Sequence, residues 1–60
     1  MINPGMKLWW NNKFTVVDFF RKKYGEPLRC LRVDENQLVV VRIFNEEVSF
    51  SEEYFRISPE

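Results

Sequence analysis

The most apolar stretch of the chain is the seven-residue run Leu38–Phe44 (LVVVRIF), which holds one charge and neither Gly nor Pro. Its β-branched side chains fit a pleated backbone better than a helix, and its length is typical of a strand. On such a strand Val39, Val41 and Ile43 share one face, and the rest of the run shares the other. Both faces are apolar, so the strand needs cover on two sides. A curled barrel edge, a helix at 15–24 or another subunit would supply the second cover.

Sixty residues predict a single small domain, with residues 1–5 as a lead-in and 58–60 as a tail. A chain of this size buries only about 60% of the surface that it exposes when unfolded, so its core depends on large side chains. Ten aromatic residues supply them. Cys30 is the only cysteine and there is no histidine, so an intrachain disulfide and the usual ligands of a zinc site are absent. We therefore predict no metal, no cofactor and a buried, inert thiol.

The chain also lacks the signals of a secreted or membrane protein. No apolar run approaches the roughly 18 residues of a membrane span, and no secretory leader opens the sequence. A lone thiol fits a reducing compartment. The expectation is a cytoplasmic protein with no membrane contact.

Charge is divided unevenly along the chain, although the net charge is zero. Residues 1–32 hold seven basic and two acidic side chains, a net +5, and residues 33–60 hold the reverse, a net −5. A fold that separates the halves would have a basic and an acidic face. Interleaved strands would instead pair these charges, which is the favoured interpretation.

Residues 13–21 have two interpretations. Asn11-Asn12 suits the left-handed backbone of a two-residue hairpin turn, and six of the eight residues from 13 to 20 are β-branched or aromatic. Because that composition is poor for a helix, the favoured interpretation is a hairpin with strands at 6–10 and 13–21.

The alternative is a helix at 15–24. Thr15 and Asp18 have the spacing of a capping box, and Gly25 fits a C-terminal cap. Basic residues near the C-terminus would interact favourably with the helix dipole. This interpretation gives an α+β fold, with the helix packed on a three- to four-stranded antiparallel sheet.

The second half of the chain predicts strands more simply. Residues 28–33 and 38–44 flank Asp34-Glu35-Asn36-Gln37, a type I turn with a left-handed residue. After a turn at 45–47, residues 48–51 alternate as a half-exposed strand does, and a short helical turn near 51–54 precedes a brief final strand. The favoured fold is all-β, a small five-stranded barrel or meander. This element order resembles SH3-like small barrels over about residues 6–57, without a diagnostic motif that would transfer ligand residues.

Two groups of residues are candidates for binding. Trp9 and Trp10 are adjacent, so on a strand one faces the core and the other is a candidate interface anchor. The second group combines aromatic rings with a basic cluster and consists of Phe19, Arg21, Lys22, Lys23 and Tyr24. Acidic pairs elsewhere lack the spacing of a calcium loop and are expected to be solvated. Catalysis by Ser or Cys with a His base is excluded because there is no histidine.

These observations predict a non-catalytic interaction module that binds a protein partner, or itself, through exposed aromatics flanked by basic residues. Replacing either Trp9 or Trp10 by Ala is expected to leave a folded monomer that no longer binds. The alternative is an accessory protein for single-stranded nucleic acid, since bases stack on aromatic rings while Lys and Arg hold phosphates. The acidic second half argues against it. No small-molecule substrate is predicted, because the apolar residues are needed for the core.

Overall fold

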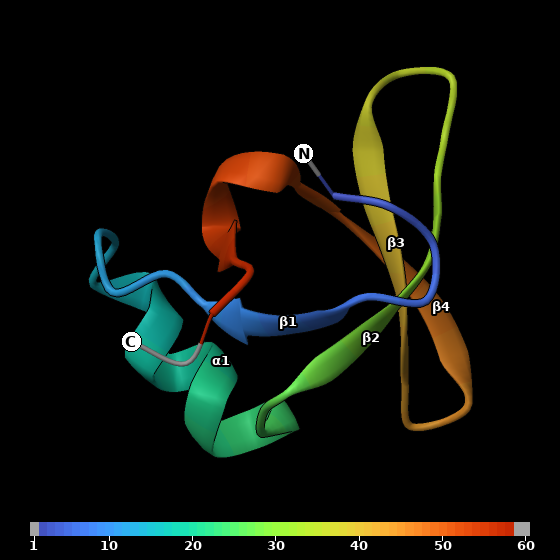
Figure 1. The fold of residues 1–60 in the computed structure, drawn as a ribbon. Coiled ribbons are helices and arrows are strands. Elements are labelled where there is room, and N and C mark those ends of the chain that lie inside the picture. Colours follow the sequence, from blue (N-terminus) through green and yellow to red (C-terminus); the bar gives the residue numbers. More distant parts are fainter. Residues whose placement is uncertain (1, 59–60) are drawn as a thin grey trace.

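The structure is a computed structural model and describes residues 2–58 (Figure 1). Its elements, in chain order, are strand β1 (Lys7–Trp10), helix α1 (Val16–Tyr24), strands β2 (Leu28–Val33), β3 (Leu38–Ile43) and β4 (Glu46–Ser51), the 3₁₀ turn η1 (Glu52–Tyr54) and strand β5 (Phe55–Arg56). Pro59 and Glu60, the end of the expected tail, lie outside the described residues. None of the helices in the described range is both long and apolar enough to cross a membrane.

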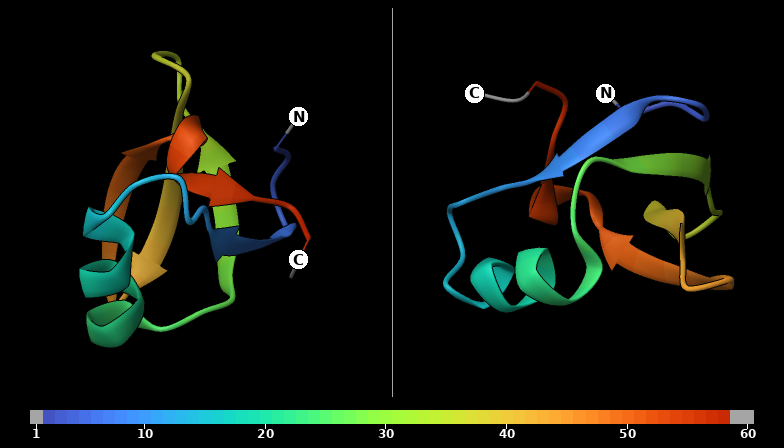
Figure 2. Two further views of the ribbon diagram at one scale, coloured as in Figure 1. Left: turned by 90° about the vertical axis from the view of Figure 1, so that its left-hand side faces the viewer. Right: turned by 90° about the horizontal axis from the view of Figure 1, so that it is seen from below.

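The five strands form one antiparallel sheet in the order β4-β3-β2-β1-β5. The predicted antiparallel five-stranded sheet and the helical turn before the last strand are confirmed, although the strand predicted at 13–21 is not among the five. Within residues 2–58 no ladder joins the edge strands β4 and β5, so the structure shows a sheet without showing a closed barrel. Figure 2 shows that α1 lies across one side of this bent sheet, between β1 and β4.

The favoured prediction of a strand at 13–21 is wrong, because residues 16–21 lie within α1. Val17, Phe20 and Tyr24 repeat at helical spacing, and all three side chains pack in or against the core. Burial of this face stabilises a helix whose local propensity is poor, as tertiary packing commonly does. Gly25 ends the helix with a φ of 79°, and its N–H donates to the Arg21 carbonyl at 2.9 Å. The C-terminal cap of the alternative prediction is therefore present.

The start of α1 differs from both predictions. Thr15 has helical backbone angles and makes no side-chain capping hydrogen bond, so the expected capping box does not form. The prediction of a hairpin turn at Asn11-Asn12 is also wrong. Asn11 instead binds η1, since its backbone N–H donates to the Tyr54 carbonyl at 2.8 Å and its side-chain amide donates to the Glu53 carbonyl at 3.2 Å. These bonds connect the segment that enters α1 to the other end of the chain.

The β2–β3 hairpin is confirmed, and β2 has the predicted bounds. One carboxylate oxygen of Asp34 accepts hydrogen bonds from the backbone N–H groups of Asn36 at 2.9 Å and Leu38 at 3.0 Å. The Gln37 N–H donates to the Asp34 carbonyl at 3.0 Å, and Gln37 is the left-handed residue, with a φ of 66°. The chain then turns again after Ile43, and β4 begins at Glu46, two residues before the predicted start.

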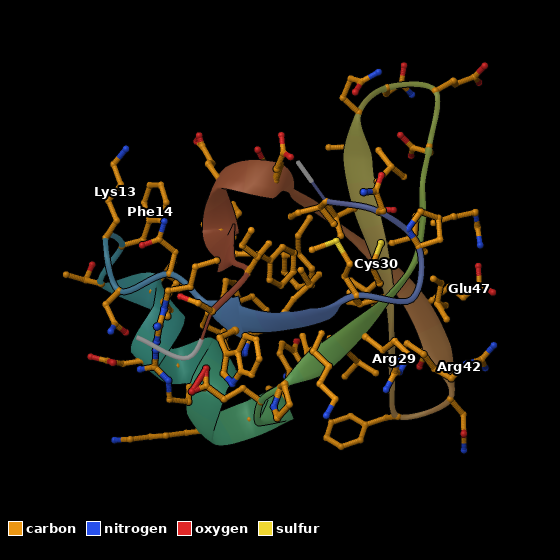
Figure 3. The ribbon with its side chains drawn as sticks, viewed as in Figure 1. Lys13, Phe14, Arg29, Cys30, Arg42 and Glu47 are labelled. Atoms are coloured by element: carbon orange, nitrogen blue, oxygen red, sulfur yellow. The ribbon has the colours of Figure 1, made fainter. Side chains whose placement is uncertain are left out.

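The inner face of β3 is buried as its pattern predicts, with Val39 and Val41 fully covered and Ile43 nearly so. Its outer face is only partly covered, with Leu38 half-buried and Arg42 exposed. Val40 is also buried and is opposite Arg32 and Ser49 in the ladder. Arg32 and Arg42 both extend to the Glu47 carboxylate on this face, at 2.8 Å and 3.8 Å, and Figure 3 shows Arg42 beside Glu47. The hydrocarbon stems of such side chains can cover apolar surface.

Candidate interaction surface

Trp10 is at the centre of the aromatic core. Its side chain is fully buried, and its ring lies 5.0–6.4 Å, centroid to centroid, from four other rings, those of Phe20, Tyr24, Phe50 and Phe55. The indole N–H donates to the Gly25 carbonyl at 2.9 Å. The backbone N–H donates to Glu26 Oε1 at 3.1 Å, and the backbone carbonyl accepts from Arg56 Nε at 3.0 Å. Trp10 therefore cannot contact a partner directly, and its place in the predicted binding set is corrected.

Trp9 is half-buried on the opposite face of β1, opposite Arg56 in the ladder with β5. The ring contacts of the described residues do not connect it to Phe19 or Tyr24. Of the two predicted tryptophans, only Trp10 contacts the aromatic residues of α1, and Trp9 is in none of the ring contacts of the described residues.

Arg21 connects α1 to the segments that precede and follow it. Its guanidinium contacts Asp18 Oδ1 and Glu26 Oε2, each at 3.1 Å, and also hydrogen-bonds to Asn12 Oδ1. Its side chain is only 29% exposed. These contacts hold the chain around Trp10. Because two carboxylates also balance its charge, Arg21 offers little positive charge to a partner.

Three of the other predicted residues, Phe19, Lys23 and Tyr24, lie close to Phe44, which the sequence pattern did not indicate as a binding residue. Lys23 Nζ lies 5.5 Å from the centroids of both the Phe19 and the Tyr24 rings. The Tyr24 ring lies 6.0 Å from that of Phe44, at the end of β3. We call these four residues, Phe19, Lys23, Tyr24 and Phe44, the aromatic–lysine surface. Phe19 is 56% exposed and Phe44 is 71% exposed. Lys22 is an exposed neighbour on α1.

A hollow of about 200 Å³ lies between α1 and the β3–β4 hairpin. Lys23 and Tyr24 line it from the helix side, and Ile43, Phe44, Glu46 and Val48 line it from the hairpin side. The hollow therefore has apolar walls and carries one lysine and one glutamate. It adjoins the aromatic–lysine surface, with which it shares Lys23, Tyr24 and Phe44.

Phe44 is held in an unfavourable backbone conformation. It and Asn45 connect β3 to β4 as a two-residue loop, with φ angles of 51° and 68°. Positive φ at both central residues is the mark of a type I′ turn, which favours Asn and Gly. A bulky side chain in this region costs about 1–2 kcal/mol. The sequence pattern predicts this turn at 45–47, which leaves Phe44 inside the strand. The signal available was Asn45, which tolerates the left-handed conformation.

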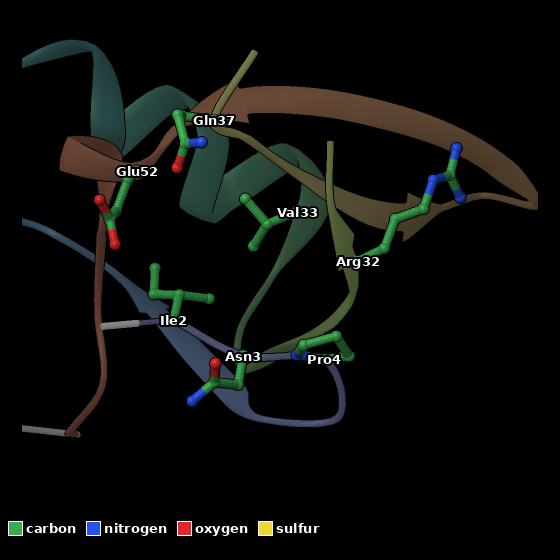
Figure 4. A pocket seen from close by; sticks show the side chains of 7 residues that line it. All are labelled: Ile2, Asn3, Pro4, Arg32, Val33, Gln37 and Glu52. Atoms are coloured by element: carbon green, nitrogen blue, oxygen red, sulfur yellow. The ribbon is translucent and has the colours of Figure 1, made fainter. Parts of the chain in front are cut away.

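A second hollow, of about 310 Å³, lies between the N-terminal segment and the β2–β3 hairpin (Figure 4). Ile2 and Val33 supply its apolar lining. Glu52 and Gln37 lie toward one side, whereas Arg32 points away toward the outer face, where it binds Glu47. These polar groups do not converge on a common point, so this hollow is a weaker candidate for a binding site.

Cys30 lies in the same buried cluster as Trp10. Burial raises the pKa of its thiol above the ordinary value of 9.0, and a hydrogen bond with the Arg32 backbone only partly offsets this. A thiol is a poor nucleophile in this state because the thiolate is the reactive form.

Comparison with known proteins adds no further assignment, since no family model, curated protein or solved structure matches this chain.

Proposed function

We propose that this protein is a non-catalytic interaction module that binds a protein partner through the aromatic–lysine surface. The observation that carries this proposal is Phe44, which is 71% exposed although its backbone is left-handed. A residue that is neither buried nor suited to its turn contributes little to folding. Local conflicts of this kind concentrate at functional sites. Large aromatic side chains are also common anchors of protein interfaces.

The neighbours of Phe44 support the same proposal. Phe19 adds a second exposed ring, and Lys23 lies between the two aromatic groups of α1. The hollow beside them has room for an apolar side chain. An anchor ring, an adjacent hollow and a charged rim are the usual parts of a protein-binding site. The single buried thiol, Cys30, favours a reducing, cytoplasmic setting for this interaction.

Binding of single-stranded nucleic acid is the second candidate function, and the placement of Lys23 over two rings favours it. The neutralised Arg21 and the glutamate at the hollow count against it. Titration of labelled oligonucleotides at two salt concentrations distinguishes the functions. Phosphate binding weakens steeply with salt, so absence of a salt-dependent shift at low ionic strength eliminates this candidate.

The proposed function is tested with a matched pair of variants, Phe44→Ser and Ile57→Ser. Both residues are exposed and apolar, but Ile57, at 52% exposure, is not part of the aromatic–lysine surface. Immobilised wild-type and variant proteins are compared for capture of proteins from an extract of the source cells. Loss of a hot-spot ring commonly costs about 2 kcal/mol or more, so we expect Phe44→Ser to lose captured proteins that Ile57→Ser retains. Equal capture by all three proteins contradicts the proposal.

A further inference from the structure

We infer that the partner of the aromatic–lysine surface is a second copy of the same chain, bound about a two-fold axis that passes beside Phe44. This inference rests on the proposed function and specifies the partner. It follows from the charges, the size and the exposed ring of one site, the hollow between α1 and the β3–β4 hairpin.

The charged residues at this hollow in one copy are complementary to those in a second copy. Lys23 lies on the α1 side and Glu46 on the hairpin side, and both are exposed. In a two-fold interface, a residue i that contacts residue j is matched by j contacting i. Lys23 of each copy then faces Glu46 of the other, so that two opposite-charge pairs form. The net charge of zero adds no long-range repulsion between the copies.

The hollow also has a size that suits one aromatic ring. Its volume is about 200 Å³, and a cavity of about 150 Å³ lined by apolar side chains is known to bind benzene. Phe44 is the most exposed of the large hydrophobic residues in the described chain. Its ring in each copy would enter the hollow of the other, beside Tyr24 and Val48. The exchange covers both exposed rings at once.

The opposite face of the hairpin is less suited to this role. There Glu47 is already engaged by Arg32 and Arg42 within one copy. A partner on that face would have to compete with these pairs, whereas Lys23 and Glu46 take part in none of the ion pairs found among residues 2–58. A chain of 60 residues also has a small core, for which self-association is a common supplement.

Charge exchange tests the inference directly. Sedimentation equilibrium of the full chain, from about 1 μM to about 1 mM, should show the wild-type mass rising from 7.3 kDa toward twice that value. Lys23→Glu and Glu46→Lys each place like charges at both contacts, and each should weaken the dimer roughly 10- to 100-fold. The two variants mixed in equal amounts carry opposite charges at both contacts and should recover the wild-type mass. Circular dichroism checks that each variant stays folded.

Three results would overturn the inference. These are a wild-type mass that stays at 7.3 kDa throughout, single variants that dimerise as well as wild type, and a mixture that dimerises no better than its components. The capture experiment distinguishes a failure of self-association from a failure of the proposed function. A monomer whose capture of other proteins still requires Phe44 overturns the second copy as partner and leaves the interaction module in place. A monomer with no Phe44-dependent capture overturns both.

Discussion

Trp10 and Phe44 are the two ends of one path of ring contacts, joined through Tyr24 at 6.4 Å and 6.0 Å. Trp10 is fully buried, and its indole N–H, backbone N–H and backbone carbonyl all have hydrogen-bond partners. Phe44 is 71% exposed and occupies a backbone conformation that disfavours its side chain. The contacts of Trp10 therefore stabilise the fold, whereas a Phe at position 44 is unfavourable for the turn that it occupies.

The other hairpin of the sheet shows how a left-handed position is filled when only the fold matters. In the β2–β3 turn that position is Gln37, a polar residue, and the Asp34 carboxylate satisfies two backbone N–H groups beside it. The β3–β4 turn has two left-handed positions, and the first of them carries the exposed ring of Phe44. This contrast supports the proposal that the β3–β4 turn binds a partner as well as closing the hairpin.

The largest expected effect is at the buried end of the path. Trp10→Ala should destabilise the protein by about 3–5 kcal/mol, because it leaves a large cavity in the core. Folding free energies of about 0.05–0.15 kcal/mol per residue leave a chain of this length little reserve. We therefore no longer expect Trp10→Ala to stay folded. Circular dichroism and urea titration should show that most of this variant is unfolded. Trp9→Ala, at a half-buried position, is the control and should lose less. Equal losses would remove the distinction between the two tryptophans.

Gly25→Ala should weaken the support of Trp10 without removing its ring. Gly25 has a φ of 79° and a ψ of −176°, a region essentially restricted to glycine, and its carbonyl accepts the indole N–H. Holding alanine there costs about 1–3 kcal/mol, which a urea titration would measure as a lower midpoint. No atom lies within 4 Å of the added Cβ position, so the effect is conformational. An unchanged midpoint would show that the loop relaxes freely.

Phe44→Asn should have the opposite sign at the exposed end. Asparagine is favoured in the left-handed turn, and the exposed ring loses little burial, so we expect a gain of about 0.5–1 kcal/mol in the free energy of unfolding. The same change should abolish association. A more stable protein that no longer binds would separate folding from function at this residue. A variant that is both less stable and unable to bind would point to a structural role instead.

The smallest effect concerns Cys30, which reports how well the core around Trp10 is shielded from solvent. Burial raises the pKa of its thiol in the folded state, so the folded protein holds this proton more firmly than the unfolded chain does. The resulting stability is fully present below the unfolded pKa near 9.0 and is lost as pH rises through the folded pKa. Urea midpoints measured across this range should fall more steeply for wild type than for Cys30→Ala. Parallel pH profiles would mean that the thiol is not shielded.

Features of the fold that depend on neighbouring residues could be predicted from local patterns. Alternation and turn chemistry identified β2, β3 and the hairpin between them, and the exposed residues Phe19, Lys22 and Lys23 were found as surface candidates. Gly25 marked the end of α1 correctly, because its signal is a backbone requirement that does not depend on packing.

Packing between distant segments of the chain determines which tryptophan is buried, whether residues 16–24 are helical, and where Phe44 points. The two periodicities are hard to separate over nine residues, and the core contacts of Val17, Phe20 and Tyr24 select the helix over local propensity. Alternation places Trp9 and Trp10 on opposite faces without saying which face meets the other rings. The aromatic–lysine surface joins α1 to the β3–β4 hairpin, about twenty residues along the chain. Such a surface exists only once the chain has folded, because no local pattern brings those side chains together.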